Sequence, residues 1–482
     1  MVGSTKLEVR KQTADLGNAR LGPLMVKLSI PGMVGMLVMS LYNIVDTFWV
    51  SGLPEGTHAI AALTVLFPLQ MIAGALGMGL SAGVTSLVSR RFGETRLDQV
   101  NRAAGNAVAL ALELGVVLAI IVIPLARPVV MLFGATADIV GPSVAYLTTV
   151  AFGFSFQLFV ATTNGLYRGS GNTFVPMLLL ISGAAVNAAL DPFLISGWGP
   201  FPRLGIQGAA PATVIAQVIA ASLSAVYLLS RHSGYQLRLE HLHLRKRILL
   251  DIAQVGAPAS AESVLRSVVA SVFNWVLGGF GPAAIAAQGL SLRVMMIVVS
   301  CLGGGVHQAL VPTAGYCFGA RNYRRMWQSY RIAALWTSSG GLLRSALVCY
   351  FAPQIMAPFA REPELARLGP LALRLRMSSF FLMEPQMMAV FLFQGMGMGG
   401  RAMTLTVSRN ALLVVPALFL LSAHFGVTGA FAAQPVADVL GLFVAGGMLW
   451  KAYRQYPPQE RSGEDQEEPE PAALPEQVWA SE

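Results

Sequence analysis

Segments apolar enough to lie within a lipid bilayer recur along the whole chain, and they constrain its fold more than any other feature. A bilayer-spanning helix needs about 20 predominantly apolar residues, and apolar runs approaching that length occupy 108–124, 176–190, 294–310 and 411–422. Because hydrocarbon cannot hydrogen-bond free backbone groups, such segments must be helical. Only 12% of the residues are charged, against roughly 25% in soluble domains. The sequence therefore predicts an all-α integral membrane protein.

These apolar segments predict twelve transmembrane helices. They cover residues 24–51, 59–89, 103–125, 138–167, 172–196, 206–229, 248–278, 283–317, 327–352, 367–396, 402–423 and 427–450. The termini and the even-numbered loops hold 21 of the 33 lysines and arginines, whereas the odd-numbered loops hold four. By the positive-inside rule, we expect a multi-pass protein of the plasma (inner) membrane with both termini in the cytoplasm. The net charge of +9 then reflects topology rather than nucleic-acid binding.

The two halves of the chain resemble each other at a nearly constant offset. Ala59–Ala62 (AIAA) recurs as Ala284–Ala287, and the Phe-Gly pair that begins at Phe92 recurs at Phe318, at offsets of 225 and 226. One repeat therefore contains six helices, so both copies enter the membrane from the same side. We expect two six-helix bundles related by a pseudo-two-fold axis along the membrane normal, an arrangement that transporters use.

The repeat divides the chain into five segments. They are a cytoplasmic N-terminal segment at 1–23, an N-lobe at 24–229, a cytoplasmic linker at 230–247, a C-lobe at 248–452 and an acidic cytoplasmic tail at 453–482. The tail is rich in proline and carboxylates, which predicts disorder. The linker is basic, and we expect it to be a solvated loop. The alternative is that His241 and His243 bind a metal.

Two acids of the first half lie inside predicted helices and share a helix face with an asparagine. Asp46 follows Asn43 by three residues and Asp191 follows Asn187 by four. An acid within the bilayer costs roughly 2.5–3.5 kcal/mol on insertion scales, so it is a functional candidate. Both helices run outward and both acids fall late in them. This predicts a shared site in the outer half that takes up a proton or a small cation.

Pro192 is a residue at which we expect the fifth helix to bend, and it strengthens the case for Asp191. Because proline has no N–H, the carbonyl of Ala188 loses its helical partner beside the acid and can bind a cation or a water molecule. The alternatives are that Asp191 and Pro192 merely end the fifth helix at the membrane interface, and that Asp46 is interfacial too. Glu113, in the third helix, has no polar companion on its face, and we expect it to have no functional role.

The second half repeats the helices but not these acids. Glu262 and Arg266 are four residues apart and favour an ion pair along one helix. Glu384, followed by Pro385, is the second-half candidate for a coupling or substrate-binding role. The predicted helices of the second half also contain Arg293, Arg344, Arg374 and Arg376.

Four motifs resemble those of a known family. They are LYNIVDTFWVSGL at 41–53, NGLYRGSGN at 164–172, VNAALDPF at 186–193 and GIQGAAPATVIAQ at 205–217. On these motifs, and through essentially all twelve helices, the chain resembles the multidrug and toxic compound extrusion (MATE) family, most closely its prokaryotic DinF-like branch. The resemblance implies a secondary transporter rather than an enzyme: H⁺ or Na⁺ enters while a cationic amphipathic compound leaves. Such multidrug efflux implies antibiotic resistance.

The resemblance also implies where the coupling ion binds. In the DinF-like branch, the aspartates of the first and fifth helices define the cation site of the N-lobe. Carried over to this chain, that site consists of Asp46, Asn164, Asn187, Asp191 and Thr213. Asn164 lies near Arg168 and hence near the inner face of the membrane. The resemblance also implies that the first helix bends at Pro31 when the site is protonated. Other branches place essential acids on the seventh and tenth helices. Glu262 and Glu384 lie on these helices but not at the positions of the family's acids, so that role is not carried over to them.

Two other functions remain open at this point. A lipid-linked oligosaccharide flippase of the same superfamily would need a more cationic central cavity, which the C-lobe arginines permit. A membrane enzyme would need clustered nucleophiles, histidines or metal ligands, whereas His307 and His424 stand alone. We expect no cofactor and no bound metal other than the coupling ion, small organic cations as substrates, and a monomer in the bilayer. The residues do not distinguish H⁺ from Na⁺, since carboxylates with amide partners suit both.

Overall fold

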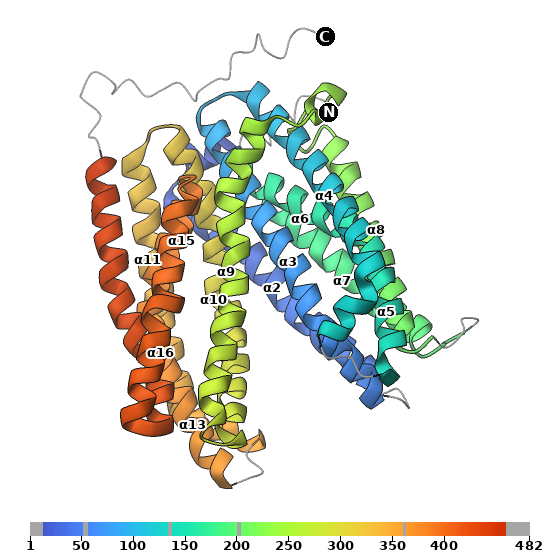
Figure 1. Ribbon diagram of the computed structural model, residues 1–482. Coiled ribbons are helices and arrows are strands. Elements are labelled where there is room, and N and C mark those ends of the chain that lie inside the picture. Colours follow the sequence, from blue (N-terminus) through green and yellow to red (C-terminus); the bar gives the residue numbers. More distant parts are fainter. Residues whose placement is uncertain (1–12, 52–55, 134–136, 200–203, 360–362, 459–482) are drawn as a thin grey trace.

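Two helical bundles lie side by side in the computed structural model, one from each half of the chain (Figure 1). The structure describes residues 13–51, 56–133, 137–199, 204–359 and 363–458. The side chains of residues 40–65, 67, 68, 137, 206, 297 and 299–303 lie outside that description. The acidic tail from 459 onward, for which we predict disorder, is also outside it.

The N-lobe is built from seven helices that make six crossings. They are α2 (Leu21–Ser51), α3 (Gly56–Gly93), α4 (Leu97–Leu132), α5 (Ala137–Phe152), α6 (Phe154–Gly169), α7 (Phe174–Leu194) and α8 (Ile206–Leu229). Helices α5 and α6 meet at Gly153 at an angle of 47° and together form one bent crossing. A side chain at Gly153 would collide with Gln217 of α8, so the glycine allows the bend to pack closely against that helix.

The C-lobe repeats this arrangement with more breaks. Its long helices are α9 (Lys246–Gly278), α10 (Pro282–Gly319), α11 (Tyr323–Tyr350), α13 (Pro363–Ser378), α14 (Phe380–Gly395), α15 (Gly399–Val407) and α16 (Val414–Gln455). Short turns of helix are η1 (Leu239–Leu242), α12 (Ala352–Met356) and η2 (Ala357–Phe359), and a π-helical segment, η3 (Ser408–Leu413), joins α15 to α16. Helix α16 contains a sharp kink at Gly426, whose φ of 61° suits glycine, so it makes two crossings rather than one.

The described helices account for the predicted twelve crossings. Eight segments are long and apolar enough to span a membrane, and the α5–α6 pair makes a ninth. Helix α10, the α13–α14 pair and the second arm of α16 supply the other three. The α13–α14 pair is the most charged of these because it carries Arg374, Arg376 and Glu384. The predicted all-α, twelve-helix, two-bundle fold is confirmed.

The lobes contact each other at one end, which we call the inner end: the end where α3 finishes and α9 begins. A side chain at Gly83 of α3 would collide with the carbonyl of Ile252 of α9, so glycine is what lets these helices touch. Ser86 of α3 donates a hydrogen bond to the carbonyl of Gln394 at 2.5 Å, deep in the same contact. Away from the inner end the two sets of ribbons diverge (Figure 1).

The linker between the lobes differs from the solvated loop that we expected. Tyr235 and His241 are buried, and the Tyr235 hydroxyl donates to the carbonyl of Leu166 at 2.6 Å. Burial raises the pKa of the Tyr235 hydroxyl well above its usual value. Asn106 of α4 donates to the carbonyls of His241 and His243 at 2.9 and 3.0 Å and accepts the backbone N–H of Arg245 at 2.6 Å. The linker's backbone groups are satisfied by the N-lobe, which explains why this polar segment packs instead of extending into water.

Candidate functional site

Helices α2 and α7 place the two predicted acids at the same level of the N-lobe. They pack in the same direction, and Gly35 of α2 faces Leu180 of α7, where an added Cβ would lie 3.2 Å from Leu180 Cδ2. Asp46 and Asp191 each follow these contact residues by eleven positions, which is about 16 Å at 1.5 Å per residue. The Asp46 side chain lies outside the described residues, so this placement rests on the backbone of α2.

Three of the predicted residues gather where α7 and α8 pack together. The Asp191 side chain is completely buried, and Asn187, one turn earlier on α7, is buried beside it. Asn187 Nδ2 donates to Thr213 Oγ1 of α8 at 3.5 Å, and the Thr213 hydroxyl donates to the carbonyl of Ala209 at 3.0 Å. A buried carboxylate is costly unless it binds a proton, a cation or several donors. The cluster combines a buried carboxyl group with an amide and a hydroxyl group where α7 meets α8.

Both predicted bend positions lie inside helices. Pro192 is buried within α7, which continues to Leu194, and the Asp191 carbonyl accepts the N–H of Ile195 at 2.8 Å. Asp191 and Pro192 thus lie buried in the last turn of α7. Pro31 lies inside α2 and is half-buried, next to Gly32, which faces Gly305 and Gln308 of α10.

Asn164 stands apart from this group. It is buried on α6 beside Thr163, whose hydroxyl accepts a hydrogen bond from Ser224 of α8 at 2.7 Å. Ser224 lies eleven residues beyond Thr213 on α8, or about 16 Å nearer the inner end. Asn164 Oδ1 is buried and has no hydrogen-bond partner among the described residues. The structure thus brings Asn187, Asp191 and Thr213 together and places Asn164 in a separate, inner position.

In the C-lobe, Glu384 of α14 lies between two basic groups. Its side chain is completely buried, and Oε1 is 3.3 Å from Arg344 Nη2 of α11. Oε2 is 3.6 Å from His307 Nε2 of α10, and the His307 ring stacks on Phe391 with centroids 4.7 Å apart. The expectation that His307 stands alone is wrong, because α10 and α14 pack side by side although the two residues are far apart in sequence.

Arg344 is held rigidly in this cluster. Its Nη1 donates to the carbonyl of Val298 at 2.7 Å and its Nε to that of Gly340 at 3.0 Å. Gly341 gives α14 room to approach, since an added Cβ there would lie 3.3 Å from Glu384 Cγ. Carbonyl groups of α10 and α11 thus fix the guanidinium of Arg344 against the carboxylate of Glu384.

The other C-lobe candidate, Glu262, forms a local pair. Arg266 Nη2 lies 2.6 Å from Glu262 Oε1 on the same face of α9, which is the pair that their spacing favours. A third acid, Asp438 of α16, was missed by the sequence reasoning although it lies within the twelfth helix. It is buried and accepts hydrogen bonds from Ser379 at 2.7 Å and Gln434 at 3.2 Å. The spacing of Gln434 and Asp438, one helical turn apart, is the signal that could have revealed it.

No group of three metal-binding side chains occurs among the residues that the structure describes. The polar clusters of both lobes instead combine carboxylates with amides, hydroxyls, an imidazole or guanidinium groups. Such sets suit protons, alkali cations and organic ions. They do not contain the thiolate or histidine sets that transition metals prefer.

Comparison with known proteins identifies the architecture. The MatE family model matches the chain twice, over residues 31–193 and 258–420. The two matches begin 227 residues apart, in line with the internal repeat in the sequence. Together they cover more than half of the chain, and each takes in most of one lobe.

Relatives of similar length point the same way. The multidrug export protein MepA of Staphylococcus haemolyticus is 24% identical over 87% of this chain and 91% of its own. A protein of Shewanella oneidensis named FAD transporter is 26% identical over 89% of this chain and 94% of its own. A crystal structure of MATE in the straight conformation superposes with a TM-score of 0.85, at 28% identity, over 92% of this chain and 99% of that one.

Proposed function

Because this chain belongs to the MatE family of multidrug and toxic compound extrusion transporters, we propose that it exports cationic amphipathic compounds in exchange for H⁺ or Na⁺. It is a multi-pass membrane protein of a transporter family whose substrates are small organic compounds. The lipid-linked oligosaccharide flippase is not favoured, since the relatives described above are named for the export of drugs and the transport of FAD. We propose that it acts as a monomer in the plasma membrane, without a cofactor, and with its termini in the cytoplasm.

The observation that carries this proposal is the buried Asp191 beside Asn187 and Thr213, level with the backbone of Asp46. Two carboxylates at one depth in a poorly hydrated site raise one another's proton affinity, and amide and hydroxyl oxygens can also ligate Na⁺. Proton or cation binding removes the charge that disfavours burial. Release of the ion on the other side of the membrane restores this negative charge. Occupancy of the site therefore changes how α2 packs against α7.

Helix α2 links this site to the contact between the lobes. Its outer part carries Asp46, and its middle packs on α10, where Gly32 lies against Gly305 and Gln308. Pro31 stands at that contact and lacks the N–H that would tie it to the preceding turn. A change of charge at the acid site can therefore bend α2 at Pro31 and alter its fit against the C-lobe.

We propose that the inner end faces the cytoplasm and that the state described here is closed on that side. Three contacts would have to open for the opposite state to form: Gly83 with Ile252, Ser86 with Gln394, and the Arg91–Asp251 ion pair at 3.3 Å. None of these contacts buries a strong, isolated charge pair, so rocking of the lobes can exchange them for water at modest cost. In this mechanism Glu384 is the C-lobe candidate for a coupling or substrate-binding role.

Transport by inside-out vesicles tests the proposal. Vesicles that contain the full chain should take up a fluorescent organic cation when a pH gradient or a Na⁺ gradient is imposed, and the effective gradient identifies the coupling ion. Asp191→Asn should abolish uptake. The matched control is Glu113→Gln, because Glu113 is exposed on α4, outside the cluster. Gradient-driven uptake that survives in the Asp191→Asn protein would contradict the proposal.

A further inference from the structure

The segment that precedes α2 lies across the inner end of both lobes. Residues 13–18 are helical, and the chain then turns into α2. We call residues 13–19 the inner strap. Its one large apolar side chain, Leu16, is completely buried, whereas Ala14 and Asn18 on either side are exposed. A short, mostly polar segment is thus docked on the protein through a single apolar anchor.

The C-lobe holds the inner strap by its backbone. Leu16 belongs to the same core cluster as Cys317 of α10. Arg325 of α11 donates from Nε to the carbonyl of Leu16 at 3.0 Å. From Nη2 it donates to the carbonyls of Asp15 and Ala19, at 3.3 and 2.5 Å. Carbonyl groups at the end of a helix lack helical partners, so a guanidinium placed there satisfies them and holds the segment in position.

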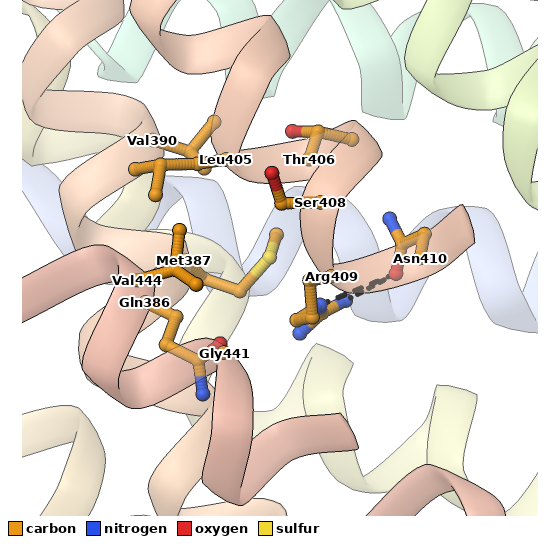
Figure 2. A pocket seen from close by; sticks show the side chains of 10 residues that line it. All are labelled: Gln386, Met387, Val390, Leu405, Thr406, Ser408, Arg409, Asn410, Gly441 and Val444. Carbon is orange, nitrogen blue, oxygen red and sulfur yellow. Dashed lines mark hydrogen bonds between the residues drawn. The ribbon is translucent and has the colours of Figure 1, made fainter. Parts of the chain in front are cut away.

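A second arginine of the C-lobe shows why the reach of Arg325 matters. Arg409 Nε and Nη2 both donate to Oδ1 of the adjacent Asn410, at 3.2 and 3.0 Å, beside a small cavity (Figure 2). These bonds fix only the helical segment that contains both residues. The bonds of Arg325 instead join residues 306 to 310 positions apart, so they determine where the start of the chain lies.

The N-lobe holds the inner strap by one side-chain hydrogen bond among the described residues. Thr13 Oγ1 donates to the carbonyl of Ser170 at 3.2 Å. Ser170 caps the end of α6 and follows Gly169, where an added Cβ would lie 3.0 Å from Cγ1 of Val88 on α3. The accepting carbonyl is therefore part of the packed N-lobe, and Thr13 is the end of the strap that crosses to it.

Between its two ends, the inner strap covers the crossing of α3 and α10. An added Cβ at Gly17 would lie 2.8 Å from Cε1 of Tyr316, whose ring packs against the cores of both lobes. At the same crossing, Gly93 of α3 approaches the carbonyl of Tyr316, and Gly319 of α10 approaches that of Arg90. The strap thus lies over a point at which the backbones of the two lobes touch.

Helix α2 continues from the inner strap and is fastened to different lobes along its length. Three apolar residues of its first half belong to the C-lobe core: Leu24, Met25 and Leu28. Gly35, further along, faces Leu180 of α7 in the N-lobe. Opening of the inner side must therefore separate the strap from the N-lobe or pull the start of α2 out of the C-lobe core. A single hydrogen bond is the weaker of these two attachments, so the strap should move with the C-lobe.

We propose that the inner strap is a latch that holds the lobes together on the inner side and releases Thr13 from Ser170 each time that side opens. Arg325 is a positioning residue in this latch, because it acts through the strap. The inference rests on the proposed function in one respect, namely that the inner side opens during transport. Loss of the latch should raise the fraction of protein that is open on the inner side.

Inner opening can be measured in the purified full-length protein in lipid nanodiscs. Spin labels on Gln99→Cys of α4 and Gln328→Cys of α11, both exposed positions, report the distance between the lobes once the three native cysteines are replaced. Thr13→Val removes the hydroxyl and keeps the shape of the side chain. It should raise the ratio of open to closed protein about fivefold, as expected for one lost hydrogen bond. Asn18→Ala, at an exposed position of the strap, is the matched control and should leave the ratio unchanged.

A double variant distinguishes a latch from two separate packing effects. A latch works only while both ends are attached, so Thr13→Val should change nothing further in the Arg325→Gln protein. Arg325→Gln should also expose Cys317, whose Sγ lies 4.0 Å from the carbonyl of Leu16. In a protein that keeps only this cysteine, a maleimide should label it faster after Arg325→Gln but not after Thr13→Val. Arg324→Gln, at the exposed neighbouring position, is the charge-matched control.

The proposal is overturned if Thr13→Val leaves the ratio of open to closed protein at the value of the Asn18→Ala protein. It is equally overturned if the effects of Thr13→Val and Arg325→Gln add in the double variant. If Arg325→Gln does not fold, the comparison of Thr13→Val with Asn18→Ala decides alone. Both measurements use neither a gradient nor a substrate, so a failure of the antiport proposal would appear in vesicle uptake instead.

Discussion

The two lobes share one helical scaffold but place different chemistry inside it. The N-lobe interior gathers neutral hydrogen-bonding groups around Asp191, namely Asn187 and Thr213. The C-lobe interior instead contains arginines paired with Glu262 and Glu384. A duplicated fold therefore need not duplicate function, since packing constrains the helices while the polar positions can diverge. The N-lobe acid thus lies among neutral hydrogen-bonding groups, whereas these two C-lobe acids lie beside guanidinium groups.

The strongest test of this difference is removal of the N-lobe acid. Asp191→Asn should reduce gradient-driven efflux by more than 100-fold, because an amide cannot exchange a proton and binds cations weakly. The protein should remain folded in membranes, since the amide nearly matches the carboxylate in volume and costs less to bury. Efflux of a fluorescent cation, with the amount of folded protein measured by gel filtration, checks both statements. Equal losses in Asp191→Asn and Glu384→Gln would erase the proposed difference between the lobes.

Breaking the Arg344–Glu384 pair should mainly affect stability. Arg344→Gln leaves a completely buried carboxylate without its cation, and removing one partner of a buried pair typically costs about 3–5 kcal/mol. The free energy of unfolding in detergent should fall by that order. Arg331→Gln, an exposed arginine on the same helix, is the matched control and should change it by less than about 0.5 kcal/mol. A normal stability for Arg344→Gln would show that this ion pair does not stabilise the fold.

The sequence predicted the helices well because their signal is local. Apolar runs such as 108–124 and the offset between Phe92 and Phe318 do not depend on what packs against them. The spacing of Asn187 and Asp191 likewise identified a polar face before its neighbours were known. The i, i+4 spacing of Glu262 and Arg266 was sufficient to predict their ion pair, because both residues lie on one helix.

What the sequence could not supply were contacts between distant helices. His307 and Glu384 come together only because α10 packs on α14, and no spacing rule joins residues so far apart. The docking of the linker depends on Asn106, a single amide on α4 whose partners are backbone groups. The family motif assigned Asn164 to the cation site. Its position beside Thr163 and Ser224 instead depends on how α6 and α8 pack against each other.

The contact between the lobes can be broken through one glycine. Gly83→Ala should push α3 away from α9, because its Cβ would collide with the carbonyl of Ile252. Overpacking of this kind costs about 1–3 kcal/mol, so the inner-closed state should lose population and transport should slow about tenfold. Gly74→Ala on the same helix has open space around it and should leave transport unchanged. Cysteine cross-linking across α3 and α9 reports the loss of closure directly, and unchanged cross-linking would contradict the expected separation.

The smallest effect is expected at the half-exposed pair of the C-lobe. The Arg266 side chain is 53% exposed and that of Glu262 only 9%, so the two partners should differ when removed. Glu262→Gln leaves a hydrated guanidinium and should cost about 0.5 kcal/mol of unfolding free energy, as for helix-surface pairs. Arg266→Gln leaves a buried carboxylate and should cost more, about 1–2 kcal/mol. Neither change should alter efflux by more than about twofold. If Glu262→Gln instead abolished efflux, the pair would belong to the coupling machinery and both lobes would carry driving-ion chemistry.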